Sequence, residues 1–156
     1  MKGKLPILES EYSEYFSDAT VNSVFLLSIN ESQNIWNNNI DQKADSYFRL
    51  PDDNWLVVTE QIIIGDWKED FNANKVQDVQ QLLNRSVTWN DEDIVLFCIR
   101  KNKILETNWS EFKRLWINFI LCEDDCPILI NHQIKGCAIL FRPIGDIAKI
   151  GQCKNH

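Results

Sequence analysis

The sequence predicts an α+β fold, in which a mainly antiparallel sheet of about five to seven strands is covered by about three helices in a single domain, residues 1–156. Short β-branched and aliphatic runs recur along the chain. In the second half only a few residues join these runs, which favours antiparallel pairing over crossover connections. One segment also places aromatic side chains at helical spacing. We expect this third helix on one sheet face, and the first two helices or tryptophan-bearing loops on the other.

The first predicted strand is the apolar run 24–29. Asn30 follows as a helix cap, with Gln33 three residues later, which is the spacing of a capping box. This first helix is expected to end in the asparagine-rich piece 37–39, because asparagine side chains compete for backbone hydrogen bonds. A polar loop is predicted from 41 to 54.

Two β-branched runs come next in the chain. Leu56–Val58 and Ile62–Ile64 are separated by three polar residues, so they are predicted as two short strands or one long strand. A second amphipathic helix is predicted over Lys75–Arg85. Its apolar residues recur at helical steps: Val76, Val79, Leu82 and Leu83.

The middle of the chain carries the clearest signals. Ile94–Ile99 is apolar throughout, as in a strand covered on both faces, and Lys101-Asn102 is short enough for a hairpin return along Ile104–Thr107. Asn108 is the predicted cap of the third helix, with Glu111 three residues later. The helix has one almost wholly apolar face: Trp109, Phe112, Leu115, Trp116, Phe119 and Ile120.

Lys113 is an exception on this apolar face. A lysine stem can lie along apolar surface while its ammonium group reaches water or a carboxylate. We therefore expect a snorkelling lysine here, and a buried lysine with a lowered pKa is the functional alternative.

Three C-terminal runs complete the predicted sheet. Ile128–Ile130, Cys137–Phe141 and Ile147–Ile150 are apolar and separated by short turns. Gly145 lies in the last of these turns, where a tight return commonly needs a positive φ.

Composition limits the possible partners. Apolar residues make up 44% and charged residues 25%, as in ordinary soluble globular proteins. Sixteen basic and 23 acidic residues give a net charge of −7, which repels phosphate backbones and anionic membranes, so neither nucleic acid nor membrane is an expected partner. No apolar run approaches a membrane span, and the N-terminus lacks the apolar core of a secretion signal. A cytoplasmic protein is predicted.

The five cysteines show no disulfide framework, and no disulfide is expected. Cys122, Cys126, His132 and Cys137 form a C-x3-C-x5-H-x4-C pattern that is close to a zinc knuckle. Two intervals are one residue too long, and the runs around the cysteines read as core strands. These four are therefore only weak metal candidates, and no metal or cofactor is predicted.

Two acidic turns are the predicted partner-binding sites. They contain Asp91, Glu92, Asp93, Glu123, Asp124 and Asp125. Consecutive carboxylates attract hard cations, but no calcium-loop spacing is present, so we expect solvated turns. Only two histidines occur, which leaves a nucleophile–histidine–acid triad poorly supplied, and no catalytic residue is predicted.

Residues 67–151 resemble an uncharacterised family of small bacterial proteins that is known as a domain of unknown function. The resemblance is carried by an ordered series of residues: Phe97-Cys98, Glu106-Thr107-Asn108-Trp109, Phe112, Trp116-Ile117-Asn118-Phe119, Asp124-Asp125 and Pro127-Ile128-Leu129. It implies a single shared fold and brings no activity with it.

Two functional hypotheses from different classes follow. The first is a non-enzymatic interaction protein that presents acidic turns around exposed aromatic side chains to a basic partner, as a toxin-neutralising immunity protein does. The second is a small hydrolase or metal-dependent enzyme with carboxylates in a tryptophan-lined cleft. The lack of recognisable catalytic groups favours the first.

Overall fold

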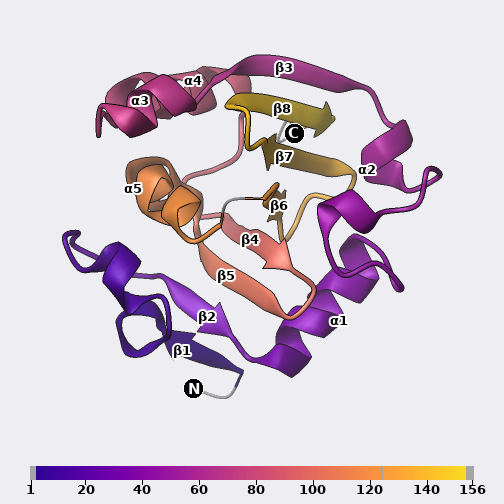
Figure 1. The fold of residues 1–156 in the computed structure, drawn as a ribbon, viewed down its shortest axis with the longest axis horizontal. Coiled ribbons are helices and arrows are strands. Elements are labelled where there is room, and N and C mark those ends of the chain that lie inside the picture. Colours follow the sequence, from indigo (N-terminus) through magenta and orange to yellow (C-terminus); the bar gives the residue numbers. More distant parts are fainter. Residues whose placement is uncertain (1–2, 124, 154–156) are drawn as a thin grey trace.

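The computed structural model describes residues 3–123 and 125–153, and it contains an eight-stranded antiparallel sheet with helices on both faces (Figure 1). The strand order is β1-β2-β5-β4-β6-β7-β8-β3, so β1 and β3 are the edges. The strands are β1 Lys4–Pro6, β2 Phe25–Leu27, β3 Gln61–Asp66, β4 Ile94–Arg100, β5 Lys103–Asn108, β6 Ile128–Asn131, β7 Cys137–Phe141 and β8 Asp146–Gly151. The predicted α+β class is confirmed, with one strand more than expected.

Five α-helices accompany the sheet. They are α1 Ile29–Asn39, α2 Trp55–Val58, α3 Lys68–Asn72, α4 Gln77–Ser86 and α5 Trp109–Leu121, and the 3-10 turns are η1 Ile7–Glu9, η2 Ser13–Phe16 and η3 Tyr47–Arg49. The three longest helices, α1, α4 and α5, are those expected from the sequence. The one-turn helix α2 and the short α3 are additions.

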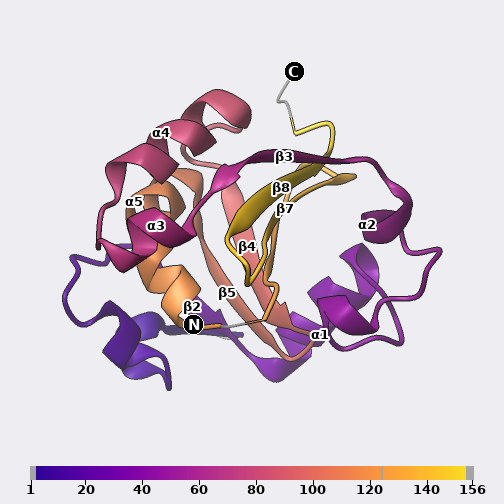
Figure 2. The same cartoon turned by 45° about the horizontal axis from the view of Figure 1, so that its top comes forward.

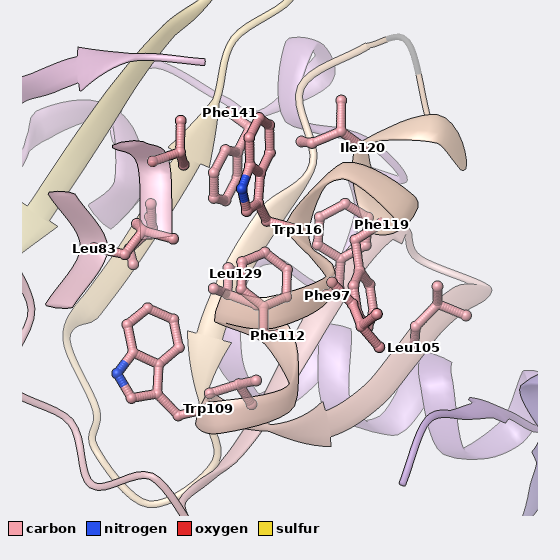
Figure 3. Packing of buried hydrophobic residues seen from close by; sticks show 14 of the residues in the cluster. Leu83, Phe97, Leu105, Trp109, Phe112, Trp116, Phe119, Ile120, Leu129 and Phe141 are labelled. Atoms are coloured by element: carbon pink, nitrogen blue, oxygen red, sulfur yellow. The ribbon is translucent and has the colours of Figure 1, made fainter. Parts of the chain in front are cut away.

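Helix α5 lies against the sheet as its apolar face predicts. Trp109, Phe112, Trp116 and Phe119 are completely buried (Figure 3). Phe112 and Phe119 are 4.9 Å apart between ring centroids, and both rings pack on Phe97 of β4. The predicted cap is also confirmed, because the Asn108 side chain accepts a hydrogen bond of 2.8 Å from the Glu111 amide.

The second predicted helix lies on a different face from the one expected. Val79, Leu82 and Leu83 of α4 belong to the same buried cluster as α5, so α4 and α5 cover one sheet face together. The other face is covered by α1 and α2, through the buried side chains of Trp36 and Leu56. Figure 2 shows the sheet between these two groups of helices.

Two local predictions in the first half were wrong. The cap of α1 is Ser28, which accepts a hydrogen bond from the Glu31 amide, and not Asn30. Residues 56–58 form the helical turn α2 rather than a strand, because Asn54 caps them by accepting a hydrogen bond of 2.9 Å from the Leu56 amide. A side-chain cap here overrides the strand preference of the two valines.

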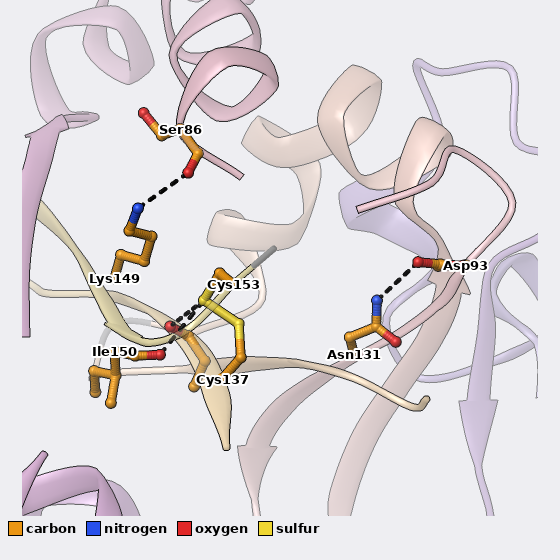
Figure 4. The surroundings of a disulfide bond; sticks show 8 residues. Ser86, Asp93, Asn131, Cys137, Lys149, Ile150 and Cys153 are labelled. Carbon is orange, nitrogen blue, oxygen red and sulfur yellow. Dashed lines mark hydrogen bonds between the residues drawn. A yellow bond between two sulfur atoms is a disulfide. The ribbon is translucent and has the colours of Figure 1, made fainter. Parts of the chain in front are cut away.

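The expectation of no disulfide was also wrong. Cys137 at the start of β7 and Cys153 beyond the end of β8 form a disulfide, with their Cα atoms 5.1 Å apart (Figure 4). The two strands are antiparallel neighbours, so the chain leaving β8 passes the beginning of β7. Pairing geometry that the sequence does not show brings the two sulfurs together.

Candidate functional site

The two acidic turns predicted as partner-binding sites lie at opposite ends of α5. Ser110 at the start of the helix donates its amide hydrogen bond to the Asp91 carbonyl, whereas Glu123 follows the last turn. Thirteen helical residues span about 20 Å, so the turns do not form one acidic surface. Asp124 lies outside the described residues.

The first acidic turn is largely bonded within the molecule. Asp93 is 6% exposed, and its carboxylate accepts hydrogen bonds from the Asn90 amide and from the Asn131 side chain at 3.0 Å (Figure 4). Asp91 forms an ion pair of 3.0 Å with Lys113, whose stem is buried on α5 as predicted. Glu92 of this turn is exposed, and its carboxylate makes no hydrogen bond or ion pair within residues 3–123 and 125–153.

The second turn is also partly internal. The Glu123 side chain is only 3% exposed and pairs with Arg100 at 3.2 Å. Its carboxylate also accepts a hydrogen bond from the Asp125 amide, while Asp125 itself is exposed. Much of the predicted acidic character therefore stabilises the turns themselves.

The four zinc candidates do not converge. Cys137 is in the disulfide, Cys122 packs on the α5 side of the sheet and Cys126 on the α1 side, while His132 is exposed after β6. No group of three or more metal-ligating side chains occurs within 3–123 and 125–153. Burial raises the pKa of the Cys122 and Cys126 thiols to about 12, so both are protonated at neutral pH.

A cavity of about 440 Å³ at the end of α5 resembles the cleft of the enzyme hypothesis. Trp67 and Phe71 form part of its wall, and Glu123 and Asp125 lie at its border. Two polar groups at this cavity are not free to react: the Cys122 thiol is protonated, and the Glu123 carboxylate is already paired with Arg100. The cavity thus has tryptophan and carboxylates, but neither of these two groups is an activated nucleophile or base.

The tryptophans do not supply the exposed aromatic side chains of the interaction hypothesis. Trp55 is half-buried and the other five are buried. Phe48 lies four residues after the buried loop residue Ala44 and is 63% exposed. Among the described residues it is the single large aromatic side chain with this much exposure. It belongs to a part of the surface that the sequence did not indicate.

Exposed aliphatic side chains gather in the same part of the chain. Val58 of α2 is 65% exposed, and Ile62 and Ile63 of β3 are 48% and 54% exposed. We define the α2–β3 surface by six exposed residues: Phe48, Val57, Val58, Glu60, Ile62 and Ile63. These residues lie close together in the chain, at one edge of the sheet, and gathered exposed apolar groups mark interaction sites more often than single ones do.

This surface carries an unusual share of the charge. Residues 45–66 contain five carboxylates and one basic side chain, a net formal charge of −4 out of −7 for the chain. The five, Asp45, Asp52, Asp53, Glu60 and Asp66, are all exposed. The basic residue, Arg49, lies 3.7 Å from Asp45 in a solvent-exposed pair. The exposed apolar side chains of this segment are therefore flanked in sequence by exposed negative charge.

Buried contacts hold the α2–β3 surface in place. Asn54 is 7% exposed and donates a hydrogen bond of 2.7 Å to the Ile40 carbonyl, which fixes α2 to the end of α1. Gln61 bonds to the Leu56 carbonyl and to the Tyr47 hydroxyl, and the Tyr47 ring packs edge-on against Phe48. These contacts connect the loop, α2 and β3 into one unit.

The loop before α2 is fixed by a carboxylate. Asp41 accepts hydrogen bonds from the Ala44 amide at 2.7 Å and from the Lys43 amide at 3.0 Å. The hydrogen bond from the Ala44 amide is the main reason why the pKa of Asp41 lies below its ordinary value. The ionised form of Asp41 is therefore the one that orders this loop.

Sequence reasoning missed the α2–β3 surface because exposure depends on strand position. The run Ile62–Ile64 looks like a core strand, and only the sheet order reveals it as an edge. One signal was available, since the carboxylates of 45–66 surround an apolar run with almost no basic residue among them.

The fold and this surface define a class of protein: an α+β domain built on one antiparallel sheet, with an acidic and apolar margin at β3. The chain belongs to the family described as "Protein of unknown function (DUF2947)", whose match covers residues 10–149. The expected membership in a family of unknown function is thus confirmed, over a longer stretch than the resemblance suggested. Neither the curated proteins nor the solved structures contain a match. Among the described residues, none of the helices has the length and apolar character needed to cross a membrane.

Proposed function

We propose that this protein is a non-enzymatic interaction protein that binds a basic protein partner through the α2–β3 surface. The observation that carries the proposal is the coincidence of half-exposed apolar side chains with a net charge of −4 in residues 45–66. Apolar contacts would supply affinity, and the carboxylates would attract a basic partner and align it.

The position of the charge favours this surface over the two acidic turns. Asp93 and Glu123 are almost fully buried at their carboxylates and are bonded within the molecule. Binding a partner there would require these bonds to break. The carboxylates of Asp52, Asp53 and Glu60 are exposed, so a partner can reach them without such a cost.

The enzyme hypothesis has weaker support. Its cleft exists near Trp67, but the thiol at this cavity has a pKa of about 12 and the inner carboxylate is paired with Arg100. A binding role needs no activated group, and the exposed margin at β3 fits such a role.

The test compares two sets of charge-neutralising substitutions. A partner captured by photo-crosslinking from a position at Val58 is identified, purified and titrated against the protein. The variant Asp52→Asn/Asp53→Asn/Glu60→Gln should weaken binding at least about tenfold at low salt, because three exposed carboxylates of the interface are lost. The matched control is Glu14→Gln/Glu92→Gln/Asp125→Asn, which removes the same charge from exposed positions elsewhere.

The control should change the affinity less than about threefold, and raising the salt should weaken wild-type binding. Equal effects of the two sets, an acidic partner, or an affinity that does not respond to salt would contradict the proposal.

A further inference from the structure

The free edge of β3 is the feature with the most specific consequence for binding. β3 pairs with β8 on one side, and no strand of the described chain lies on its other side. Backbone N–H and C=O groups of an edge strand alternate between the neighbour and the solvent, so part of β3 presents unpaired groups. Such an edge is a template for one more strand.

The side chains of β3 are arranged to receive a strand. Ile62 is paired with Lys149 and Ile63 with Ala148, so the two isoleucines point to opposite faces of the sheet. Both are about half exposed, and a strand added beside β3 would cover apolar surface on each face. Core strands with such residues have a neighbour on both sides, whereas among the described residues β3 has β8 on one side and no strand on the other.

The opposite edge of the sheet is much less suited to this role. β1 is three residues long and includes Pro6, which has no backbone N–H to donate. β3 is six residues long and contains no proline. Its register shifts between Ile63 and Gly65, which adds twist to the edge and disfavours flat stacking of many strands.

Charge at the two ends of β3 selects the occupant. Glu60 precedes the strand and Asp66 ends it, about 20 Å away at the rise of an extended chain. If two copies paired antiparallel through β3, Glu60 of each copy would approach Asp66 of the other. Like charges opposite each other are destabilising, so a second copy is a poor occupant and a segment with basic ends is a good one.

We infer that β3 accepts an extended segment of the basic partner as a ninth strand of the sheet. The segment has β-branched apolar residues in its middle and Lys or Arg about six residues apart at its ends, opposite Glu60 and Asp66. This inference rests on the proposed function and adds its mode of recognition: backbone pairing supplies the register, and the two flanking charges supply the preference.

The probe is the capped peptide Arg-Thr-Val-Val-Val-Thr-Arg and two N-methylated forms of it. One form is methylated on alternate amide nitrogens, and the other on the remaining set, so that composition and charge are nearly the same. A strand beside β3 uses only every second N–H of the peptide for pairing. One methylated form should therefore bind at least about tenfold more weakly than the parent peptide, and the other should keep its affinity within about threefold.

Two variants of the protein provide the matched comparison. Ile63→Lys places a cation on the exposed edge strand, and Leu8→Lys makes the same charge change at a 52% exposed residue of η1, near the opposite edge. Circular dichroism checks that both are folded. Ile63→Lys should weaken peptide binding at least about tenfold, because an edge lysine opposes both strand addition and a basic segment, and Leu8→Lys should change it less than about threefold.

The outcomes separate this inference from the proposed function. If both methylated peptides bind equally, or if the parent peptide fails to bind while the partner still depends on Asp52, Asp53 and Glu60, strand addition is wrong and the binding function stands. If ultracentrifugation shows a dimer that Ile63→Lys dissociates, the occupant is a second copy and the inference is overturned. The inference is supported if only one of the two methylated peptides loses affinity and if Ile63→Lys, but not Leu8→Lys, weakens peptide binding.

Discussion

Strands β6 and β3 have nearly the same kind of sequence and opposite environments. Ile128, Leu129 and Ile130 of β6 are 4% exposed or less, whereas Ile62 and Ile63 of β3 are about half exposed. β6 has β4 and β7 as neighbours and is covered on both faces, and β3 has β8 as its neighbour. The composition of a strand therefore does not fix its role, because sheet order decides whether its apolar side chains form core or surface.

The comparison also separates two uses of charge. Near the central strands, carboxylates are bonded internally, as in the hydrogen bond that Asp93 accepts from Asn131 at the end of β6. Around β3, the carboxylates of Asp52, Asp53 and Glu60 are exposed. Negative charge near the centre stabilises turns, and negative charge at the margin is free to act on another molecule.

The largest expected effect comes from making the same substitution in both strands. Ile128→Ala should lower the free energy of unfolding by about 2–5 kcal/mol, because it removes buried methyl groups and leaves a cavity. Ile63→Ala, at an exposed position, should cost less than about 1 kcal/mol. Urea unfolding monitored by tryptophan fluorescence measures both. Similar losses for the two variants would break the contrast between centre and margin.

Removal of the disulfide at β7 and β8 should have the second-largest effect on stability. Cys137 and Cys153 are 16 residues apart, and a link that closes a loop of this length stabilises a domain by about 3 kcal/mol. The variant Cys137→Ala/Cys153→Ala should unfold at correspondingly lower urea concentration. A reductant should destabilise the wild type and leave the double variant unchanged. Finding five free thiols in the unfolded, non-reduced protein would contradict the bond.

Gly65 tests how firmly β3 is attached to α4. A Cβ atom at this position would overlap the Leu82 side chain, so Gly65→Ala should cost about 1–3 kcal/mol through overpacking. Leu82→Ala removes the obstructing atoms. The double variant should therefore lose less stability than the sum of the losses in the two single variants, as measured by urea unfolding in a double-mutant cycle. Strict additivity would mean that the strand and α4 do not touch there.

The smallest effect concerns the loop that leads to Phe48. Asp41→Asn should lower stability at pH 7 by less than about 1 kcal/mol, because solvent screens the charge. The pKa of Asp41 is lowered in the folded state, so its contribution is present above the ordinary value of 3.8 and is lost as pH falls through the lower folded value. Thermal unfolding of wild type and variant should therefore begin to converge as pH falls below 3.8 and coincide below the folded pKa of Asp41. A constant difference across pH would exclude this role.

Much of the architecture was predictable from local patterns. Asn108 and Glu111 marked the start of α5, and the spacing of Trp109, Phe112 and Trp116 identified its buried face. The short connections of the second half indicated antiparallel pairing, which the structure has. These signals act over a few residues and do not depend on distant parts of the chain.

What escaped prediction depends on contacts distant in sequence. The Cys137–Cys153 bond, the exposure of Ile63 and the face on which α4 lies all follow from sheet order. The cap of α1 is different, since Ser28 and Glu31 have the spacing of a capping box, and the sequence therefore carries two overlapping cap candidates, Ser28 and Asn30. For the candidate site, the sequence revealed negative charge but not which carboxylates are already engaged.

The pairing of β3 with β8 has a consequence for synthesis of the chain. β3 is translated roughly 80 residues before β8, so its isoleucines leave the ribosome long before their native neighbour exists. This apolar segment therefore stays without its native neighbour while roughly 80 further residues, about half of the 156, are added. Charges that flank such a segment act as gatekeepers against aggregation, and Glu60 and Asp66 stand at the two ends of β3.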